Sequence, residues 1–373
     1  MHLYVHVPFC ARRCSYCDFA IAVRREAPSA AFAAAIEREW RSWQADRAWE
    51  GSPTLDTIYF GGGTPSRLDP EAIARLLHCF RKDRPVASAA EVTLETNPDD
   101  VTAAAADAWL AAGINRISLG VQSFEPRVLE WMHRTHTSAQ IEVAVQTLRR
   151  AGFGNISLDL IYAVPAALDR DWRADLDRAL ALGPTHLSLY GLTVESHTPL
   201  GRWTARGESL PAEDDRAAEE YLEANRRLVA AGFEHYEVSN AGRQGFRARH
   251  NSAYWRRAPF IGLGPSAHSG LGTLRCWNTR EWEEYRRRSE SNVSVREASE
   301  ELSELQVKLE ELYLGLRTTD GLPIDRIPEP IRQRWREQGW GKEPAGQGSD
   351  ARFGLTPDGW LRLDALVASL TRC

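Results

Sequence analysis

Short apolar runs rich in branched and aromatic residues alternate, over the first half of the chain, with longer stretches whose apolar residues recur at helical spacing. The short runs predict strands and the longer stretches predict helices. Six such units in succession favour an α/β fold with a parallel sheet, whose ligand site lies at the carboxyl ends of the strands. The predicted strands are 3–7, 57–60, 91–95, 116–121, 155–161 and 186–190, and the predicted helices are 28–50, 70–82, 103–112, 138–151 and 170–182.

The pattern changes after residue 190. A helix over 213–231 and a strand over 235–238 lead into a stretch, up to about residue 280, that the sequence predicts to be rich in loops. A charged amphipathic helix is predicted over 298–315, a loop over 339–350 and a hairpin that turns at 357–359. Helices followed by a hairpin favour a small winged-helix-like α/β domain. The predicted organisation is a core over 1–240, a loop-rich closing segment over 241–297 and a C-terminal domain over 298–373.

Composition narrows the class of protein. The 373 residues, 43% hydrophobic and 26% charged, suffice for a large core. A net charge of -5 argues against nucleic acid as a partner. The first residues lack the features of a signal peptide, and no apolar run approaches the roughly 20 residues of a membrane span. We therefore expect a cytoplasmic protein with no integral membrane segment, for which peripheral contact with a membrane stays open.

Three of the six cysteines, Cys10, Cys14 and Cys17, lie within eight residues directly after the first predicted strand. A reducing compartment argues against disulfides. Cysteine thiolates hold iron–sulfur clusters, normally four for one [4Fe–4S] cube. No fourth cysteine lies nearby, so this loop predicts a [4Fe–4S] cluster with one open iron. Arg12 and Arg13 are expected to hold the anionic cluster and to lower the pKa values of the thiols.

A different metal site stays open as an alternative. Structural zinc favours paired cysteines and four ligands, and here only His2 and His6 are near enough in sequence to add to the cysteines. This alternative is a metal- or cluster-stabilised binding module without catalysis. The three other cysteines are scattered and are interpreted as isolated thiols, namely Cys79, Cys276 and Cys373.

The cysteine spacing, Cys-x3-Cys-x-Tyr-Cys, resembles the radical S-adenosylmethionine superfamily. Four further segments look like its oxygen-independent coproporphyrinogen III dehydrogenase subfamily: Gly-Gly-Gly-Thr-Pro-Ser at 61–66, Leu-Glu-Thr-Asn-Pro at 94–98, Arg-Ile-Ser-Leu-Gly-Val-Gln-Ser-Phe at 116–124 and Asp-Leu-Ile-Tyr at 159–162. The segment His-Asn-Ser-Ala-Tyr-Trp at 250–255 looks like the heme chaperones within it. The resemblance implies a partial (β/α)6 barrel followed by a small C-terminal domain.

The resemblance also implies a site for S-adenosylmethionine, whose amine and carboxylate chelate the open iron while the adenosine lies across the strand ends. Glycines let the backbone approach such a ligand closely. Asp159 lies in an apolar run and needs a partner, for which ribose hydroxyls and Arg134 are the candidates. Gly191 and the loop 264–268 are expected to complete the adenine pocket. The implied contacts are Tyr4, Tyr16, Gly62, Gly63, Thr64, Glu95, Gln122, Arg134 and Asp159.

Imidazole is an ordinary axial ligand of heme iron. The resemblance implicates His250 in heme binding, and His268 is a second histidine expected to face the cavity. Only two residues precede the first predicted strand, so the N-terminal extension typical of the dehydrogenases is not expected.

Two functions therefore stay open. The favoured one is a heme chaperone that binds the cluster, S-adenosylmethionine and heme, and that delivers heme to apo-hemoproteins of the respiratory chain with the help of an electron donor. The alternative is the oxygen-independent coproporphyrinogen III dehydrogenase, which decarboxylates propionates by radical chemistry. The sequence assigns no catalytic residue, and we expect no coproporphyrinogen dehydrogenase activity.

Overall fold

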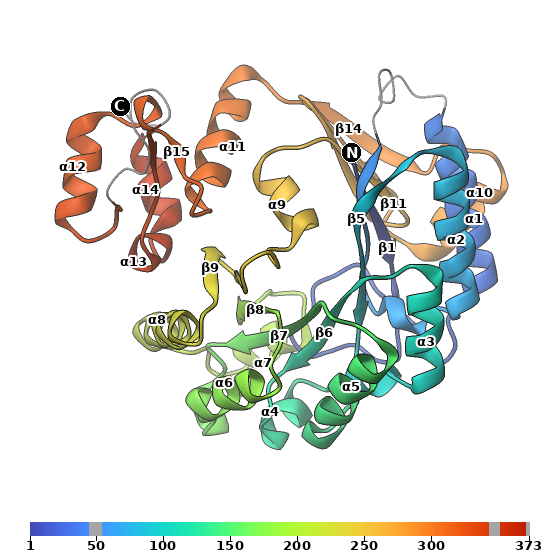
Figure 1. Cartoon of the computed structure of the whole chain (residues 1–373), viewed down its shortest axis with the longest axis horizontal. Helices are drawn as coiled ribbons and strands as arrows, with labels where there is room; N and C mark the ends of the chain where they lie inside the picture. Colours follow the sequence, from blue (N-terminus) through green and yellow to red (C-terminus); the bar gives the residue numbers. More distant parts are fainter. Residues whose placement is uncertain (45–53, 343–350, 371–373) are drawn as a thin grey trace.

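The computed structural model describes residues 1–44, 54–342 and 351–370. Within these ranges one sheet of twelve strands has the order β14-β13-β12-β11-β1-β4-β5-β6-β7-β8-β10-β9. Its central six strands run parallel, which confirms the predicted α/β class and its six βα units. Figure 1 shows the sheet curving into an open barrel with helices along its outer face. These strands are β1 (His2–Val7), β4 (Leu55–Gly62), β5 (Val86–Thr96), β6 (Arg116–Gln122), β7 (Ile156–Tyr162) and β8 (His186–Gly191).

Local signals set the ends of the outer helices. The Thr102 hydroxyl caps the start of α3 by accepting from the Ala105 amide, and Thr137 with Gln140 forms a capping box at the start of α5. Gly113 and Gly152 end these two helices in the left-handed conformation, as the sequence predicts. The helices are α1 (Ser29–Gln44), α2 (Pro70–Asp83), α3 (Ala103–Ala112), α4 (Pro126–Trp131), α5 (Ser138–Ala151), α6 (Trp172–Ala181), α7 (Pro199–Ala205) and α8 (Asp214–Ala230).

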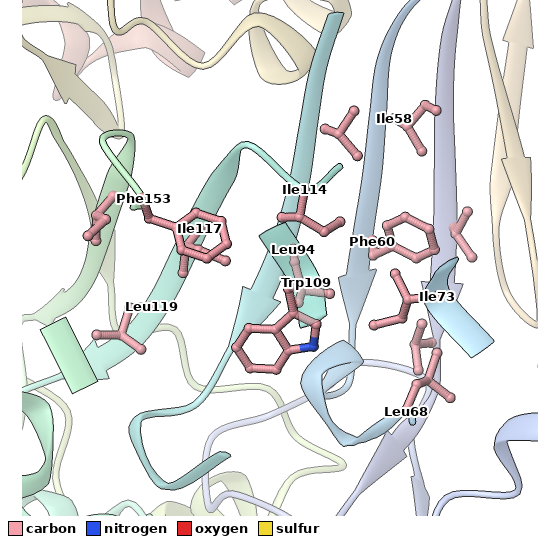
Figure 2. Packing of buried hydrophobic residues seen from close by; sticks show 14 of the residues in the cluster. Ile58, Phe60, Leu68, Ile73, Leu94, Trp109, Ile114, Ile117, Leu119 and Phe153 are labelled. Carbon is pink, nitrogen blue, oxygen red and sulfur yellow. The ribbon is translucent and has the colours of Figure 1, made fainter. Parts of the chain in front are cut away.

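The core lies between the sheet and these helices. Ile58, Phe60 and Leu94 of the strands pack with Ile73 of α2 and Trp109 of α3, all buried (Figure 2). Burying each such side chain contributes roughly 1.5–3 kcal/mol. Because side chains alternate across a strand, the residues between these apolar ones face the barrel interior. That alternation directs a polar set inward: Tyr59, Glu95, Ser118 and Asp159.

The prediction of a loop-rich stretch up to residue 280 is wrong. β11 pairs parallel with β1, and β12, β13 and β14 extend the sheet antiparallel from it. These strands are short, and they are held by backbone pairing, β11 with β1 and each later strand with the one before it, rather than by a recognisable apolar pattern. The elements are β9 (Glu234–Glu237), β10 (Asn240–Gly242), α9 (Arg249–Trp255), β11 (Phe260–Leu263), β12 (His268–Leu271), β13 (Leu274–Asn278), α10 (Trp282–Glu290) and β14 (Arg296–Glu301).

The C-terminal part differs from its prediction in two places. The helix predicted over 298–315 begins only at Glu304, because Ser303 and Gln306 form a capping box there and the preceding residues belong to β14. The hairpin predicted to turn at 357–359 is wrong, because Thr356 caps a short helix at this point. The elements are α11 (Glu304–Leu316), β15 (Leu322–Pro323), α12 (Glu329–Glu337), β16 (Arg352–Phe353), α13 (Pro357–Trp360) and α14 (Leu363–Leu370).

A second apolar cluster holds this C-terminal part together. Leu316, Trp335, Phe353 and Trp360 are buried in it, and Tyr221 attaches it to α8. Residues 45–50 of the first predicted helix, 343–350 of the predicted loop and Cys373 lie outside the described residues. In the described part of the chain, no helix is both long enough and apolar enough to cross a bilayer.

Candidate cofactor site

A cavity of about 420 Å³ lies where the parallel strands end. Polar side chains from successive strands meet the cysteine loop around it. Most of the predicted contacts line this one space, whereas Tyr4 and His250 do not. The predicted residues that line it are Cys10, Cys14, Tyr16, Cys17, Gly62, Gly63, Thr64, Glu95, Gln122, Arg134, Asp159 and Gly191.

Backbone hydrogen bonds hold the cysteine loop in place. β2 (Phe9–Cys10) pairs parallel with β3 (Ala22–Val23) and thereby closes the loop at its base. The Ser15 amide donates to the Met132 carbonyl at 3.2 Å, and the Ser15 carbonyl accepts from the Leu200 amide at 2.8 Å. These contacts fix the loop against the ends of α4 and α7, so three thiols face one cavity.

Burial sets the acidity of these thiols. Burial raises the pKa of Cys10, and it raises the pKa of Cys17 to about 11. The charge of Arg13 does lower the pKa of Cys17, as expected, but by less than burial raises it, and Arg13 also donates to the Cys17 carbonyl at 3.4 Å. Arg12 is exposed and is not among the groups that shift the pKa of Cys10 or Cys17. A cluster that binds here therefore displaces protons from these thiols.

Arg134 is the arginine that contacts the cysteine loop. Its Nη1 donates to Cys14 Sγ at 3.5 Å, and its Nη2 donates to the Asn97 side chain at 2.5 Å and to the Gly120 carbonyl at 3.0 Å. The predicted pairing of Arg134 with Asp159 is therefore absent among these bonds. Nε of Arg134 is buried and has no hydrogen-bond partner within the described residues.

Glu95 joins the end of β5 to the glycine loop. Its Oε1 accepts from the Tyr59 hydroxyl at 2.7 Å, and its Oε2 accepts from the Gly62 amide at 3.0 Å. These hydrogen bonds lower the pKa of Glu95, but burial outweighs them and raises it to about 7. The charge of Asp159 adds to the rise. Near neutral pH this carboxyl can therefore exchange its proton when a ligand binds.

Serines, rather than an arginine, are the hydrogen-bond partners of Asp159. Its carboxylate accepts from the Ser118 hydroxyl at 3.0 Å and from the Ser157 hydroxyl at 3.3 Å, and burial raises its pKa. Sequence reasoning missed Ser118 and Asn97 as members of the site. The available signals were the inward register of Ser118 on β6 and the position of Asn97 directly after β5.

Two backbone features shape the cavity wall. The register between β6 and β7 shifts at Gln122, which has a φ of 67°, so a bulge turns the chain at the cavity rim. A Cβ on Gly63 would lie 2.8 Å from the Pro8 carbonyl and 3.0 Å from Cys10 Sγ, and one on Gly62 would lie 2.7 Å from the His6 ring. Only glycine fits this cradle.

A second cavity, of about 650 Å³, adjoins the first and shares Asp18, Phe19, Gly62 and Glu95 with it. Tyr4 lines this second cavity. His268 also lines this second cavity, so the loop 264–268 does not complete the wall of the first one. Gly191 therefore lines the first cavity, where the adenine pocket is predicted, whereas the loop 264–268 does not.

His250 lies in neither cavity wall. The side chain is buried on α9, and both ring nitrogens are engaged: Nδ1 with the Thr57 hydroxyl at 2.6 Å and Nε2 with the Tyr254 hydroxyl at 2.8 Å. Burial holds its pKa well below the ordinary value. Its heme role therefore stays a prediction, and in this conformation it has no free nitrogen for iron.

The two histidines that a zinc site would need, His2 and His6, are hydrogen-bonded to other groups. His2 Nδ1 bonds to the Thr57 hydroxyl at 2.9 Å, and His6 Nε2 bonds to the Ala20 carbonyl at 3.0 Å. Among the residues that the structure describes, no three histidine, cysteine or acidic side chains converge closely enough for a single metal ion. Thiolates that share a multi-iron cluster need not converge on one point.

Comparison with known proteins defines the class. The family model described as the radical SAM superfamily matches residues 4–179. Coproporphyrinogen III oxidase (HemN) from Escherichia coli, itself described as a radical SAM enzyme, superposes with a TM-score of 0.79 at 21% identity, over 99% of this chain and 89% of that one, which shows the same fold.

The curated relatives specify the family further. The heme chaperone HemW of Synechocystis sp. is 36% identical over 333 residues, covering 87% of this chain and 80% of that protein. HemW of Mycobacterium tuberculosis is 37% identical over 336 residues, covering 89% and 85%. The chain belongs to the HemW family of the radical SAM superfamily. Membership implies a [4Fe–4S] cluster and S-adenosylmethionine as cofactors.

The residues of the first cavity fit these cofactors. Three thiols face it, a glycine cradle leaves room against Cys10, and the buried Nε of Arg134 has a hydrogen to donate. Glu95 and Asp159 supply carboxylates that suit an ammonium group or ribose hydroxyls. This donor set matches a sulfonium amino acid joined to a nucleoside.

Proposed function

We propose that this protein is a heme chaperone that binds a [4Fe–4S] cluster, S-adenosylmethionine and heme, and that passes heme to apo-hemoproteins of the respiratory chain. The observation that carries the proposal is its 36–37% identity to curated HemW heme chaperones over 87–89% of the chain. An electron donor serves the cluster, and the protein acts in the cytoplasm. Cys10, Cys14 and Cys17 are the cluster ligands.

Side chains at the strand ends bind and orient S-adenosylmethionine in this proposal. Arg134 donates from its free Nε to the carboxylate of the methionyl group, and Glu95 accepts from its ammonium or from the ribose. Asp159, held by serines, accepts from ribose hydroxyls, and Gln122 both donates and accepts at the rim. When bound, the cluster supplies the electron that cleaves a sulfonium bond. The glycine cradle keeps the ligand against the cysteine loop and excludes water.

The dehydrogenase is the second candidate because the HemN fold matches along 99% of the chain. A shared fold at 21% identity does not imply a shared activity, because activity depends on the residues of the site. An assay of turnover separates the two candidates.

The chaperone proposal predicts no turnover of coproporphyrinogen III. Anaerobic protein with a reconstituted cluster, a reductant and S-adenosylmethionine is incubated with coproporphyrinogen III, and porphyrin products are separated after oxidation. We expect no protoporphyrinogen IX above the level given by a Cys14→Ala variant. A known coproporphyrinogen dehydrogenase serves as positive control. Several turnovers per protein molecule would replace the chaperone by the dehydrogenase.

A further inference from the structure

The second cavity is lined largely by elements that do not line the first cavity. Residues of α9, β11, β12, β13 and α11 line it, together with Tyr4 and His6 of β1. Its volume of about 650 Å³ lies within the roughly 300–1,000 Å³ of ordinary small-molecule sites. It borders the first cavity at Asp18, Phe19, Gly62 and Glu95, so a molecule held here lies next to the proposed cofactor site.

His268 is the imidazole that this cavity offers to a ligand. It is the first residue of β12, and its exposed ring stacks on Trp277 with centroids 5.9 Å apart and planes 28° from parallel. Neither of its ring nitrogens makes a hydrogen bond within the described part of the chain. Burial lowers its pKa, which keeps the ring neutral and able to donate a lone pair to a metal.

The neighbouring histidines are already engaged. Both ring nitrogens of His6 are used, by the Tyr4 hydroxyl at 3.2 Å and by the Ala20 carbonyl at 3.0 Å. His250 does not line the cavity itself, but it bonds at 2.8 Å to the hydroxyl of Tyr254 and packs against the ring of Tyr4, and both tyrosines line the wall. His250 thus fixes the orientation of a wall residue rather than facing a ligand.

The arginines of this cavity differ in how far their charge is neutralised. Arg257 and Arg275 share Glu310, at 2.5 Å and 2.6 Å. Arg280 donates to the backbone carbonyl of Asp18 at 3.2 Å, and no carboxylate pairs with it among the described residues. An exposed, unneutralised guanidinium beside an imidazole suits a ligand that carries both a metal and a carboxylate.

A third cavity, of about 790 Å³, also borders α9 and has Trp255 in its wall. No histidine, cysteine or methionine is among its described lining residues, and the one phenol there, Tyr236, bonds to His186 Nε2 at 2.9 Å and to the Ala248 amide at 3.0 Å. It therefore offers no ready axial ligand, and the cavity with His268 is the better site for an iron porphyrin.

We propose that heme occupies the second cavity, with His268 as an axial ligand of the iron and Arg280 on a propionate. The inference rests on the proposed heme-binding function and specifies its site. The bond formed is a coordinate one from an imidazole nitrogen to iron, with no electron transfer. His250 is a positioning residue that holds Tyr254 against the porphyrin.

The test is a titration of the full-length, cluster-loaded protein with hemin under anaerobic conditions, followed by difference absorbance in the Soret region. His268→Gly should weaken heme binding by at least about tenfold and abolish the spectrum of imidazole-ligated heme. Added imidazole should restore that spectrum by filling the vacated space. Arg280→Ala should weaken binding while leaving the spectrum of the remaining complex unchanged. His78→Ala, an exposed histidine on α2, should behave as wild type.

His250→Ala separates the ligand from the positioning role. It should weaken binding without loss of the imidazole-ligated spectrum and without rescue by imidazole. If His268→Gly binds heme as wild type does while His250→Ala shows loss and imidazole rescue, the site assignment is wrong although the chaperone function stands. If the wild-type protein binds no heme, both the site assignment and the proposed chaperone function are wrong. Circular dichroism and iron content confirm that each variant is folded and loaded.

Discussion

Replacing Cys14 by alanine is expected to abolish the cluster, seen as loss of the broad visible absorption and of bound iron after anaerobic reconstitution. Three thiols face the first cavity, and none of the other cysteines in the described residues lines it. A [4Fe–4S] cluster normally has four thiolate ligands, and this site supplies only three. The two thiolates that remain in the variant cannot hold the cluster. The loss should be nearly complete rather than partial.

A matched control exists for this variant. Cys79 is half-buried on α2 and lines neither the first nor the second cavity, so Cys79→Ala should retain wild-type iron content. Circular dichroism of both variants tests for general unfolding. An unchanged iron content in Cys14→Ala would contradict the cluster assignment.

The affinity for S-adenosylmethionine should rise as the pH increases through about 7, because Glu95 then loses its proton. Burial raises the pKa of this carboxyl to about 7, so it is largely neutral one unit below that value and largely ionised one unit above it. The ionised form attracts a cationic ammonium and accepts hydrogen bonds more strongly. Glu95→Gln should remove this dependence and should weaken binding about tenfold on the alkaline side.

Equilibrium dialysis of the cluster-loaded protein, one pH unit below and one pH unit above the Glu95 pKa of about 7, measures this effect. The ligand and the cluster also titrate, so the informative quantity is the ratio of wild-type to variant affinity at each pH. Glu142→Gln, an exposed carboxylate on α5 that pairs with Arg178, controls for general charge effects. A ratio that stays constant across the two values would show that Glu95 does not titrate in the binding step.

The barrel was predictable because its strands are buried and follow a simple physical rule. Apolar residues such as Phe60 and Leu94 face the helices, and alternation then places Glu95 and Asp159 inside. The cysteine loop and the glycine cradle were predictable from spacing, since both follow directly from strand ends.

Other features depend on contacts that no local pattern carries. The strands β11 to β14 form because β1 offers a free edge, and the apparent hairpin after Phe353 is a helix because Thr356 caps it. Burial, rather than the neighbouring charges, sets the acidity of the thiols. The hydrogen bond between His250 and Thr57 joins residues far apart in the sequence, so no local pattern could reveal that the ring is engaged.

The most direct test of the chaperone function is transfer of heme. Cluster-loaded protein carrying one equivalent of heme is mixed anaerobically with an apo-hemoprotein of the respiratory chain, and the acceptor is separated and measured by its own heme spectrum. The account predicts that the acceptor gains heme faster than from an equal amount of free heme complexed with serum albumin, and that the donor loses the same amount. Retention of heme by the donor, with no gain by the acceptor, would contradict it.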